Sequence, residues 1–296
     1  MKKVLKALLM HSVVGAWLGR LPGVSRLYAR FVWARQMNLY FGVYGSFAHA
    51  ERAATGFNTV GWNDEGIAKV LVHEEADAAP PGFQTSQFAV MLWLSRLLKS
   101  DQAVLDMGGA GGVFYEICSR YDLLPAPMRW HVVDVPEMVK RGIARHQRLK
   151  SSMISFGTEL GEAPPSAIML MLGVMQYLPD PLGENGPGVL ETVAALPSHI
   201  LINKLPLLDE GEVWTIQNHV TSAMPYRLFN RRKVMAYFES HGYRLRDRWT
   251  VPELSVDIPF HPERTVPVLE GLHFEREAIP PVPAPRFAAG MSMQGA

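Results

Sequence analysis

The chain has 296 residues, of which 48% are hydrophobic and 19% are charged, and its formal net charge is +1. This composition is ordinary for a globular protein with a substantial core, and the small net charge argues against nucleic acid as a general partner, because phosphate binding needs clustered surplus lysine and arginine. Cys118 is the single cysteine, which excludes an intrachain disulfide and a thiolate metal site and favours a cytoplasmic protein. No other group of potential metal ligands has a recognisable spacing, so no metal is expected.

The first 50 residues contain no Asp or Glu but carry seven basic residues around short apolar runs. The opening MKKVLKALLMHSVVGAWLG looks like a signal peptide, but no cleavage-site pattern follows it, and the run is too short to span a bilayer. We therefore predict a basic amphipathic arm over 1–45. Contact of residues 1–36 with an anionic membrane surface, at the inner face of the cell membrane, is one interpretation. Packing on the main domain, or on a second subunit of a homo-oligomer, is the other.

The next part of the chain is expected to be helical. Aromatic residues recur at mostly helical spacing between 17 and 47 and indicate a packing surface. Residues 46–79 predict helices and loops, 78–82 (AAPPG) a break, and 85–99 an amphipathic helix. Residues 46–100 are therefore expected to form a helical cap.

From residue 101 onward, strand-like runs alternate with helix-like runs, which is typical of a parallel sheet covered by helices on both faces. The expected strands are 103–107, 130–134, 153–156, 167–174, 199–205, 213–217 and 243–250. The expected helices after the first strand begin near 113 and continue with 136–149, part of 180–196, and 231–241. The main domain is assigned to 101–278, and the proline-rich end, 279–296, predicts a disordered tail.

The most informative stretch is VLDMGGAGGVFYE, residues 104–116. An apolar run ends in Asp106, a glycine-dense turn occupies 108–112, and helical spacing resumes at Val113. Glycine lets the backbone adopt positive φ and approach a ligand without Cβ atoms between them. The N–H groups at the start of the following helix face the same space. The pattern predicts a strand, a ligand-binding turn and a helix, with a ligand-free glycine turn as the alternative.

The spacing within this turn separates two kinds of cofactor. Dinucleotide turns read G-x-G-x-x-G, whereas the order Asp106, Gly108, Ala110, Gly112 resembles the first motif of the Rossmann-like S-adenosylmethionine-dependent methyltransferases, E/D-x-G-x-G-x-G. The resemblance implies an α/β fold, with a mostly parallel methyltransferase sheet and here an N-terminal helical extension, and S-adenosylmethionine as the cofactor. An NAD(P)-dependent oxidoreductase would need a hydride-site pattern such as Tyr-x-x-x-Lys, which the second half lacks.

The ligand site of such a sheet lies at the carboxyl ends of its strands. Asp134 closes the second strand, where a carboxylate can accept hydrogen bonds from both ribose hydroxyls; capping of the next helix is its alternative role. By the resemblance, Thr158 stands where methyltransferases commonly have an acid against the adenine amino group, Glu159 follows it, and the segment from Gly173 lines the methionine part. The predicted cofactor-binding residues are Asp106, Gly108, Gly109, Ala110, Gly112, Asp134, Val135, Thr158, Glu159 and Gly173.

The candidate catalytic residues are Gln176 and His219. Several oxygen-methylating families have a histidine base near the position of Gln176, but an amide cannot take a proton at neutral pH. Deprotonation of the acceptor would then be assisted by His219 or by solvent, unless His219 is an ordinary loop histidine.

Residues 213–249 contain an aromatic-rich turn, an amphipathic helix and a Gly-Tyr strand. Together with YGSFAHAERAATGFN (44–58), they resemble a family of methyltransferases found among bacterial surface-polysaccharide genes, over residues 40–275. This resemblance implies O-methylation of a small-molecule or glycan acceptor, such as a sugar or glycolipid intermediate. A non-catalytic binding or assembly module remains an alternative. The predicted acceptor-binding residues are Gln217, Asn218, Tyr226, Arg227 and Asn230, and the competing interpretation is that Arg227 and Asn230 fix the following helix.

Overall fold

The structure, a computed structural model, describes residues 12–19, 21, 23–57, 59–72, 82, 84–219 and 222–277. The predicted tail at 279–296 and residues 1–11 of the predicted arm lie outside this part of the chain. Within it, no helix is long and apolar enough to cross a membrane.

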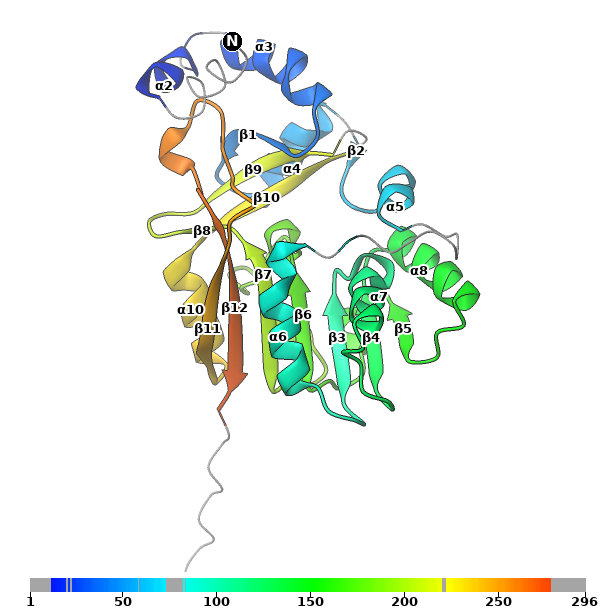
Figure 1. The fold of residues 1–296 in the computed structure, drawn as a ribbon. Coiled ribbons are helices and arrows are strands. Elements are labelled where there is room, and N and C mark those ends of the chain that lie inside the picture. The colour runs from blue at the N-terminus through cyan, green and yellow to red at the C-terminus, as the bar shows by residue number, and fades with distance from the viewer. Residues whose placement is uncertain are drawn as a thin grey trace, which may run out of the picture.

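A seven-stranded sheet forms the larger half of the molecule (Figure 1). Its strands are β3 (Ala103–Met107), β4 (Arg129–Val133), β5 (Ile154–Gly157), β6 (Ile168–Leu172), β7 (His199–Leu205), β11 (Tyr243–Val251) and β12 (Leu269–Arg276). The order is β11-β12-β7-β6-β3-β4-β5. β3 to β7 are parallel, and β12 is antiparallel to both β7 and β11. The parallel strands follow the order of a doubly wound sheet, so the predicted α/β fold class is confirmed.

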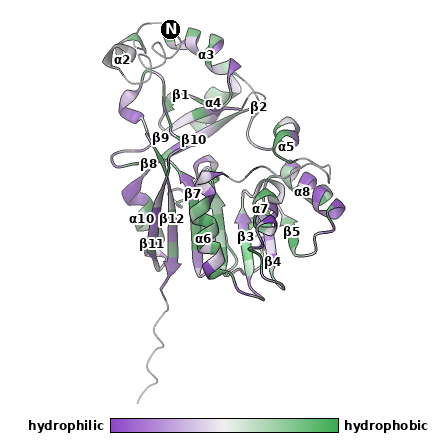
Figure 2. Cartoon of the chain, viewed as in Figure 1, coloured by the Kyte–Doolittle hydropathy of each residue, from purple (hydrophilic) through white to green (hydrophobic). Residues whose placement is uncertain are grey.

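Helices cover both faces of this sheet because its central strands are apolar on both sides. Along β6, Ile168 and Leu170 belong to one hydrophobic core, which α6 and α7 complete, whereas Met169 and Met171 belong to the core that α9 and α10 cover. Figure 2 shows the hydrophobic residues along α6 and the more polar surface of α8. The helices are α6 (Phe88–Leu97), α7 (Val113–Arg120), α8 (Pro136–Arg148), α9 (Val189–Thr192) and α10 (Arg231–Ser240). α9 is much shorter than the predicted 180–196 region.

A second sheet lies across one end of the first (Figure 1). It has the order β1-β9-β10-β2, and β8 pairs with β10. Its strands are β1 (Leu39–Tyr44), β2 (Thr59–Val60), β8 (Leu207–Leu208), β9 (Val213–Asn218) and β10 (Ser222–Asn230), and the helices of this half are α2 (Val13–Gly19), α3 (Val24–Phe31), α4 (Phe47–Thr55) and α5 (Glu65–Leu71). Short 3-10 turns lie at 33–35, 85–87, 110–112, 160–162, 175–177 and 262–264.

Two sequence predictions fail in this second sheet. Residues 39–44 are a strand rather than part of a helical arm, and 222–230 are a strand rather than a turn. Both faces of β10 are covered, so the alternation that marks a half-exposed strand is absent. Pro225 also argues against a strand in a sequence, because proline cannot donate a ladder hydrogen bond. β12 was not predicted for a similar reason: it is buried along most of its length.

Candidate functional site

A cavity of about 790 Å³ is lined by residues of both sheets. One wall comes from the carboxyl ends of β3, β4, β6 and β7, and includes Gly108, Asp134, Gly173 and Lys204. The opposite wall comes from the second sheet and the segments before it. The volume is in the range of small-molecule sites, and the location at strand carboxyl ends is where a doubly wound sheet binds its ligands.

The glycine turn packs closely on its neighbours. Gly108, Ala110 and Gly112 have φ angles of 69°, 47° and 88°. A Cβ atom at Gly108 would lie 2.6 Å from the side chain of Val174, and one at Gly112 would lie 2.7 Å from Nε2 of His146. The glycines are thus required by both backbone conformation and space. Of the turn residues predicted to bind the cofactor, Gly108 and Ala110 line the cavity, whereas Gly109 and Gly112 do not.

Asp106 lies beneath the turn and not on the cavity surface. Its side chain is buried and accepts a hydrogen bond from Nε1 of Trp130 at 3.1 Å. Burial raises the pKa of Asp106 to about 7. A Cβ atom at Gly109 would lie 2.5 Å from Oδ2 of Asp106. Asp106 therefore supports the turn from below, and the prediction that it contacts the cofactor directly is not what its position favours.

Asp134 faces the turn from the end of β4. Its Oδ2 accepts a hydrogen bond from the Ala110 N–H at 2.8 Å, and its Oδ1 accepts one from the Val135 N–H at 2.7 Å. Both Asp134 and Val135 line the cavity. The N-cap of α8 is Val135 and not Asp134, which removes helix capping as the role of this carboxylate. Each oxygen retains acceptor capacity for a neighbouring diol.

Thr158 and Glu159 do not reach the cavity. Both are exposed, and neither contributes to the lining. β5 is the edge strand of the sheet, and it ends at Gly157. Their position does not favour the predicted contact with the adenine, which stays a prediction.

The segment after β6 contributes the buried amide of Gln176 and the ring of Tyr177 to the cavity. Gly173 has a φ of 93°, and the residues from Leu172 to Pro179 form a continuous part of the lining except for Met175. Gln176 is buried, and its Oε1 has no hydrogen-bond partner among the described residues. The sequence prediction that this segment lines the site agrees with its position.

An aromatic wall, formed by Tyr40, Trp62, Tyr177 and Tyr226, also lines the cavity. Successive ring centroids are 4.9 Å apart for Trp62 and Tyr177, 5.2 Å for Tyr177 and Tyr226, and 4.9 Å for Tyr226 and Tyr40, all in edge-to-face geometry. The Tyr177 hydroxyl donates to Oε1 of Gln217 at 2.6 Å. Burial raises the pKa of Tyr40 to about 12, so its hydroxyl stays neutral. The wall offers flat apolar faces with hydroxyl and amide groups between them.

His219 stands at the end of this wall, with its ring 4.9 Å from that of Trp62. Burial lowers the pKa of His219, so the imidazole is neutral near pH 7. Nε2 of His219 and Nε1 of Trp62, like Oε1 of Gln176, are buried without a hydrogen-bond partner in the described chain. Three such atoms on residues of one cavity are unusual, because buried polar atoms are nearly always paired. A polar ligand could supply their partners.

Three of the predicted acceptor-binding residues lie away from the cavity. Nδ2 of Asn218 donates to the backbone oxygens of Trp33 and Gln36 at 2.7 and 3.0 Å. Asn230 accepts a hydrogen bond from the Lys233 N–H and so caps α10. Gln217 and Tyr226, in contrast, line the cavity.

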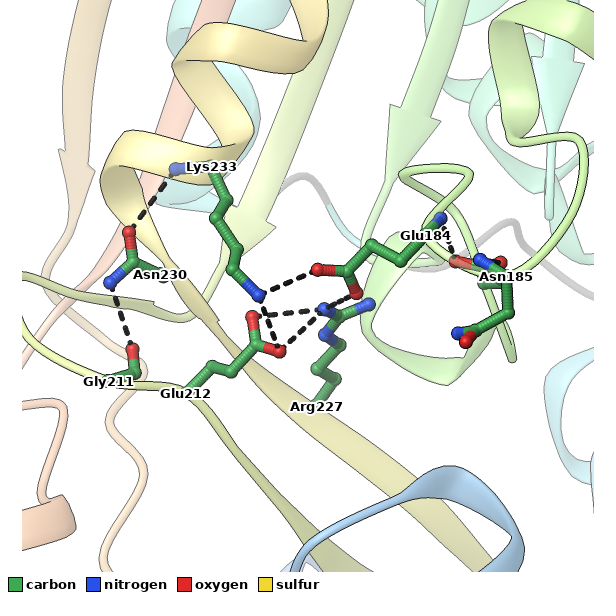
Figure 3. A network of polar contacts seen from close by, with 8 residues as sticks. Glu184, Asn185, Gly211, Glu212, Arg227, Asn230 and Lys233 are labelled. Carbon is green, nitrogen blue, oxygen red and sulfur yellow. Dashed lines mark hydrogen bonds and ion pairs between the residues drawn. The ribbon is translucent and has the colours of Figure 1, made fainter.

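Arg227 is held in a buried ion-pair network (Figure 3). Nη2 of Arg227 contacts Glu184 and lies 3.0 Å from Glu212, and Nζ of Lys233 lies 2.7 Å from Glu184 and 3.1 Å from Glu212. The guanidinium also lies 5.5 Å from the Trp214 ring centroid. These contacts occupy Arg227 with structural partners and favour the interpretation that Arg227 and Asn230 fix α10 and the sheet.

Lys204 is a cavity residue that the sequence did not single out. It is the penultimate residue of β7 and has a φ of 59°, and its Nζ donates to Oε1 of Gln84 at 2.8 Å. Burial lowers the pKa of Lys204, while nearby Glu253 raises it. A Cβ atom at Gly173 would lie 3.5 Å from Cδ of Lys204, so the lysine stem passes beside the segment after β6. Within HILINKL, one lysine near the end of an apolar strand is the only signal that could have found it.

No group of three or more His, Cys, Asp or Glu side chains in the described ranges could hold a metal ion.

No protein-family model and no curated protein matches the sequence. Among solved structures, the chain is similar to a SAM-dependent methyltransferase from Aquifex aeolicus, with 16% identity over 71% of this chain and 97% of that chain and a TM-score of 0.44. It is also similar to magnesium protoporphyrin IX methyltransferase from Synechocystis with bound SAH (12% identity, 64% and 80% covered, TM-score 0.43). A third is 1,6-didemethyltoxoflavin-N1-methyltransferase from Burkholderia thailandensis, with bound 1,6-didemethyltoxoflavin and S-adenosylhomocysteine. It shares 15% identity over 66% of this chain and 80% of that chain, with a TM-score of 0.42.

Proposed function

We propose that this protein is an S-adenosylmethionine-dependent methyltransferase. The observation that carries the proposal is the joint placement of Gly108, Ala110 and Asp134 at one end of a cavity that also has an aromatic wall. Asp134 is held by the N–H groups of Ala110 and Val135, so its carboxylate is oriented before any ligand binds. Preorganisation of this kind reduces the free energy lost on binding.

The cavity residues fit the parts of this cofactor. Asp134 would accept hydrogen bonds from the ribose diol, and the backbone at Gly108 and Gly173 would lie along the methionine part. When bound, S-adenosylmethionine supplies an electrophilic methyl group, whose transfer to an acceptor hydroxyl leaves S-adenosylhomocysteine and one proton. Gln176, with its buried unpartnered Oε1, is suited to receive a hydrogen bond from a ligand amine or hydroxyl.

The aromatic wall is the proposed acceptor site. Tyr40, Trp62, Tyr177 and Tyr226 can stack on the apolar face of a sugar ring, and the neutral tyrosine hydroxyls and the amide of Gln217 can read its hydroxyl groups. This combination supports O-methylation of a hydroxyl on a sugar or glycolipid intermediate of a surface polysaccharide. The wall holds the acceptor, and holding a reacting group near contact contributes much of the rate.

Lys204 is the proposed proton acceptor. It lies beside Gly173 at the same strand ends as the cofactor residues, and burial favours the neutral amine that can take a proton. Gln176 cannot do this, and the missing base, together with Thr158 at the adenine position, is the reason to consider a non-catalytic binding module. A lysine in the cavity supplies a candidate base and favours an enzyme over the module.

The experiment is a methyl-transfer assay with the full chain, isotopically labelled S-adenosylmethionine and membrane-extracted glycolipids as acceptors. The expected result is a labelled product that is heavier than its acceptor by one methyl group, formed with an equal amount of S-adenosylhomocysteine. Acid hydrolysis cleaves glycosidic bonds but leaves a methyl ether intact, so the methylated monosaccharide recovered after hydrolysis would identify the modified hydroxyl. Binding of S-adenosylhomocysteine without any turnover on these acceptors would support the non-catalytic module instead.

A further inference from the structure

We propose that the outer surface of α2 and α3, with the short segments that follow each helix, docks on an anionic lipid surface. This docking surface comprises Trp17, Leu21, Arg26, Leu27, Arg30, Phe31, Arg35 and Met37. The proposal is independent of the proposed enzyme activity, because it rests only on the exposure, charge and support of these residues.

Large apolar side chains are concentrated on this surface. Trp17 is 59% exposed, Leu27 58%, Phe31 54%, Met37 51% and Leu21 37%. These are five of the twelve exposed large hydrophobic residues in the part of the chain that the structure describes, although they span only 21 positions. Leu27 and Phe31 are four residues apart on α3 and so lie on the same helix face. Exposed apolar side chains that gather on one helix face, as Leu27 and Phe31 do, mark an interaction site.

The charge of the same surface has a single sign. Between residues 1 and 50 the sequence contains no Asp or Glu, and Arg26, Arg30 and Arg35 are exposed among the apolar side chains. The guanidinium carbons of Arg30 and Arg35 lie 5.9 and 5.7 Å from the Phe31 ring centroid. Arginines beside an aromatic ring match the boundary of a membrane, where the ring enters the headgroup layer and the cations meet lipid phosphates.

The opposite side of α3 is fixed to the second sheet. Tyr28 is buried against Phe41 and Phe260, with ring centroids 6.3 and 5.6 Å apart. Nε1 of Trp33 donates to the Leu39 oxygen at 2.8 Å, and Asn218 donates to the Trp33 oxygen at 2.7 Å. The exposed side chains therefore belong to a segment that is anchored to the second sheet by packing and hydrogen bonds, and this anchored segment is called the platform.

The location of this platform suits a membrane face. α2 and α3 lie at one extremity of the molecule, on the side of the second sheet that is remote from the seven-stranded sheet (Figure 1). The 3-10 turn at 262–264, which contacts α2, brings one acid, Glu263, and one base, Arg264, so it leaves the positive sign of the surface unchanged. A protein partner would be expected to meet a mixture of charges, whereas an anionic bilayer meets one sign only.

The test is co-sedimentation of the full chain with phosphatidylcholine vesicles that contain or lack phosphatidylserine, at low salt. Binding is expected only to the anionic vesicles, and added salt should weaken it. The double variant Leu27→Ser with Phe31→Ser should bind at least about tenfold more weakly, since two apolar side chains no longer enter the interface. The double variant Arg26→Gln with Arg30→Gln should bind anionic vesicles about fivefold more weakly for each arginine removed.

The matched control is Phe88→Ser with Leu92→Ser. These residues are also four apart, on α6, and are 62% and 53% exposed, so the control removes similar apolar area from another part of the surface. Its vesicle binding should equal that of the unmodified chain. The proposal is overturned if the unmodified chain ignores anionic vesicles, or if the control loses as much binding as the α3 variant. It is also overturned if sedimentation shows a dimer that the α3 variant separates while vesicle binding is absent, because the surface would then join two copies.

Discussion

The two walls of the cavity are built in opposite ways. The cofactor wall is made largely by one short stretch, the glycine turn, together with the ends of the neighbouring parallel strands. The aromatic wall is collected from Tyr40, Trp62, Tyr177 and Tyr226, which lie on four separate segments of the chain. A local motif needs only its own strand and helix to form, whereas the aromatic wall exists only after both sheets have packed together. The first wall is therefore the one that a sequence displays, and the second is the one that sets the acceptor.

The largest effect is expected from Lys204→Met, because Lys204 lies on the cofactor wall and would take the proton of the acceptor that the aromatic wall holds. Removal of a general base costs about 10²–10⁴-fold in rate, so kcat should fall by that factor while the affinity for S-adenosylhomocysteine is unchanged. In the unmodified enzyme, burial lowers the pKa of Lys204, and activity should rise with pH as this amine loses its proton. The variant should lack that rise.

The control for this prediction is His219→Gln, on the aromatic wall. If His219→Gln removes the pH-dependent rise and Lys204→Met retains it, the proton acceptor lies on the other wall and the assignment to Lys204 is wrong.

The next effect concerns stability beside the aromatic wall. Arg227→Met removes the buried partner of Glu184 and Glu212, which are partly exposed and keep Lys233, so the loss of hydrogen bonds between charged groups should cost about 1.5–3 kcal/mol. The free energy of unfolding, measured with urea, should fall by that amount. The comparison is Arg246→Met, which removes the exposed pair with Glu275 at 2.6 Å and should change stability by about 1 kcal/mol or less. Equal, small losses in both variants would return Arg227 to the list of acceptor-binding candidates.

A smaller effect is expected beneath the glycine turn. The pKa of Asp106 is raised to about 7 by burial, so the folded protein is most stable below the unfolded pKa near 3.8 and loses stability as pH rises through 7. Asp106→Asn keeps an acceptor for Trp130 and cannot ionise. Relative to the unmodified chain, the variant should become more stable between pH 4 and pH 7 and keep that gain at pH 8, measured by urea unfolding. Below pH 4 the two proteins should be equally stable, and a constant difference at all pH values would show that the carboxyl does not titrate in this way.

The smallest effect is expected at Thr158 and Glu159, and it tests whether these residues belong to the cofactor wall. Thr158→Val and Glu159→Ala alter exposed residues outside the cavity lining. The affinity for S-adenosylhomocysteine should therefore stay within about twofold of that of the unmodified chain. A loss of tenfold or more in isothermal titration would mean that the turn after β5 closes over the adenine when the cofactor binds.

The sequence was most informative where structure is local. The strands at 103–107 and 199–205 agree with their predicted bounds, because apolar runs between turn residues are visible without knowledge of the partner strands. Asp134 was found by its position at a strand end. Lys204 was not, because only burial beside Gly173 distinguishes it from an ordinary surface lysine. Arg227 and Asn230 have the right chemistry for a sugar, and the sequence could not show that Glu184, 43 residues away, already occupies the guanidinium.

Alternation along one strand explains the remaining error. On the pair β9 and β10, Gln217 and Tyr226 line the cavity, while their neighbours Asn218 and Arg227 face structural partners. Adjacent residues of a strand point their side chains to opposite faces, so Asn218 and Arg227 do not follow Gln217 and Tyr226 into the cavity. Treating 222–230 as a turn removed that constraint from the prediction.

The central claim is that the cavity binds S-adenosylmethionine through Asp134. Isothermal titration of S-adenosylhomocysteine into the full chain and into Asp134→Ala tests it most directly, with circular dichroism to show that the variant is folded. The expected result is micromolar-range binding to the unmodified chain and a loss of at least about tenfold in the variant, since hydrogen bonds to a charged group contribute about 1.5–3 kcal/mol each. Absence of binding to the unmodified chain, or equal affinity in a folded Asp134→Ala protein, would contradict the claim.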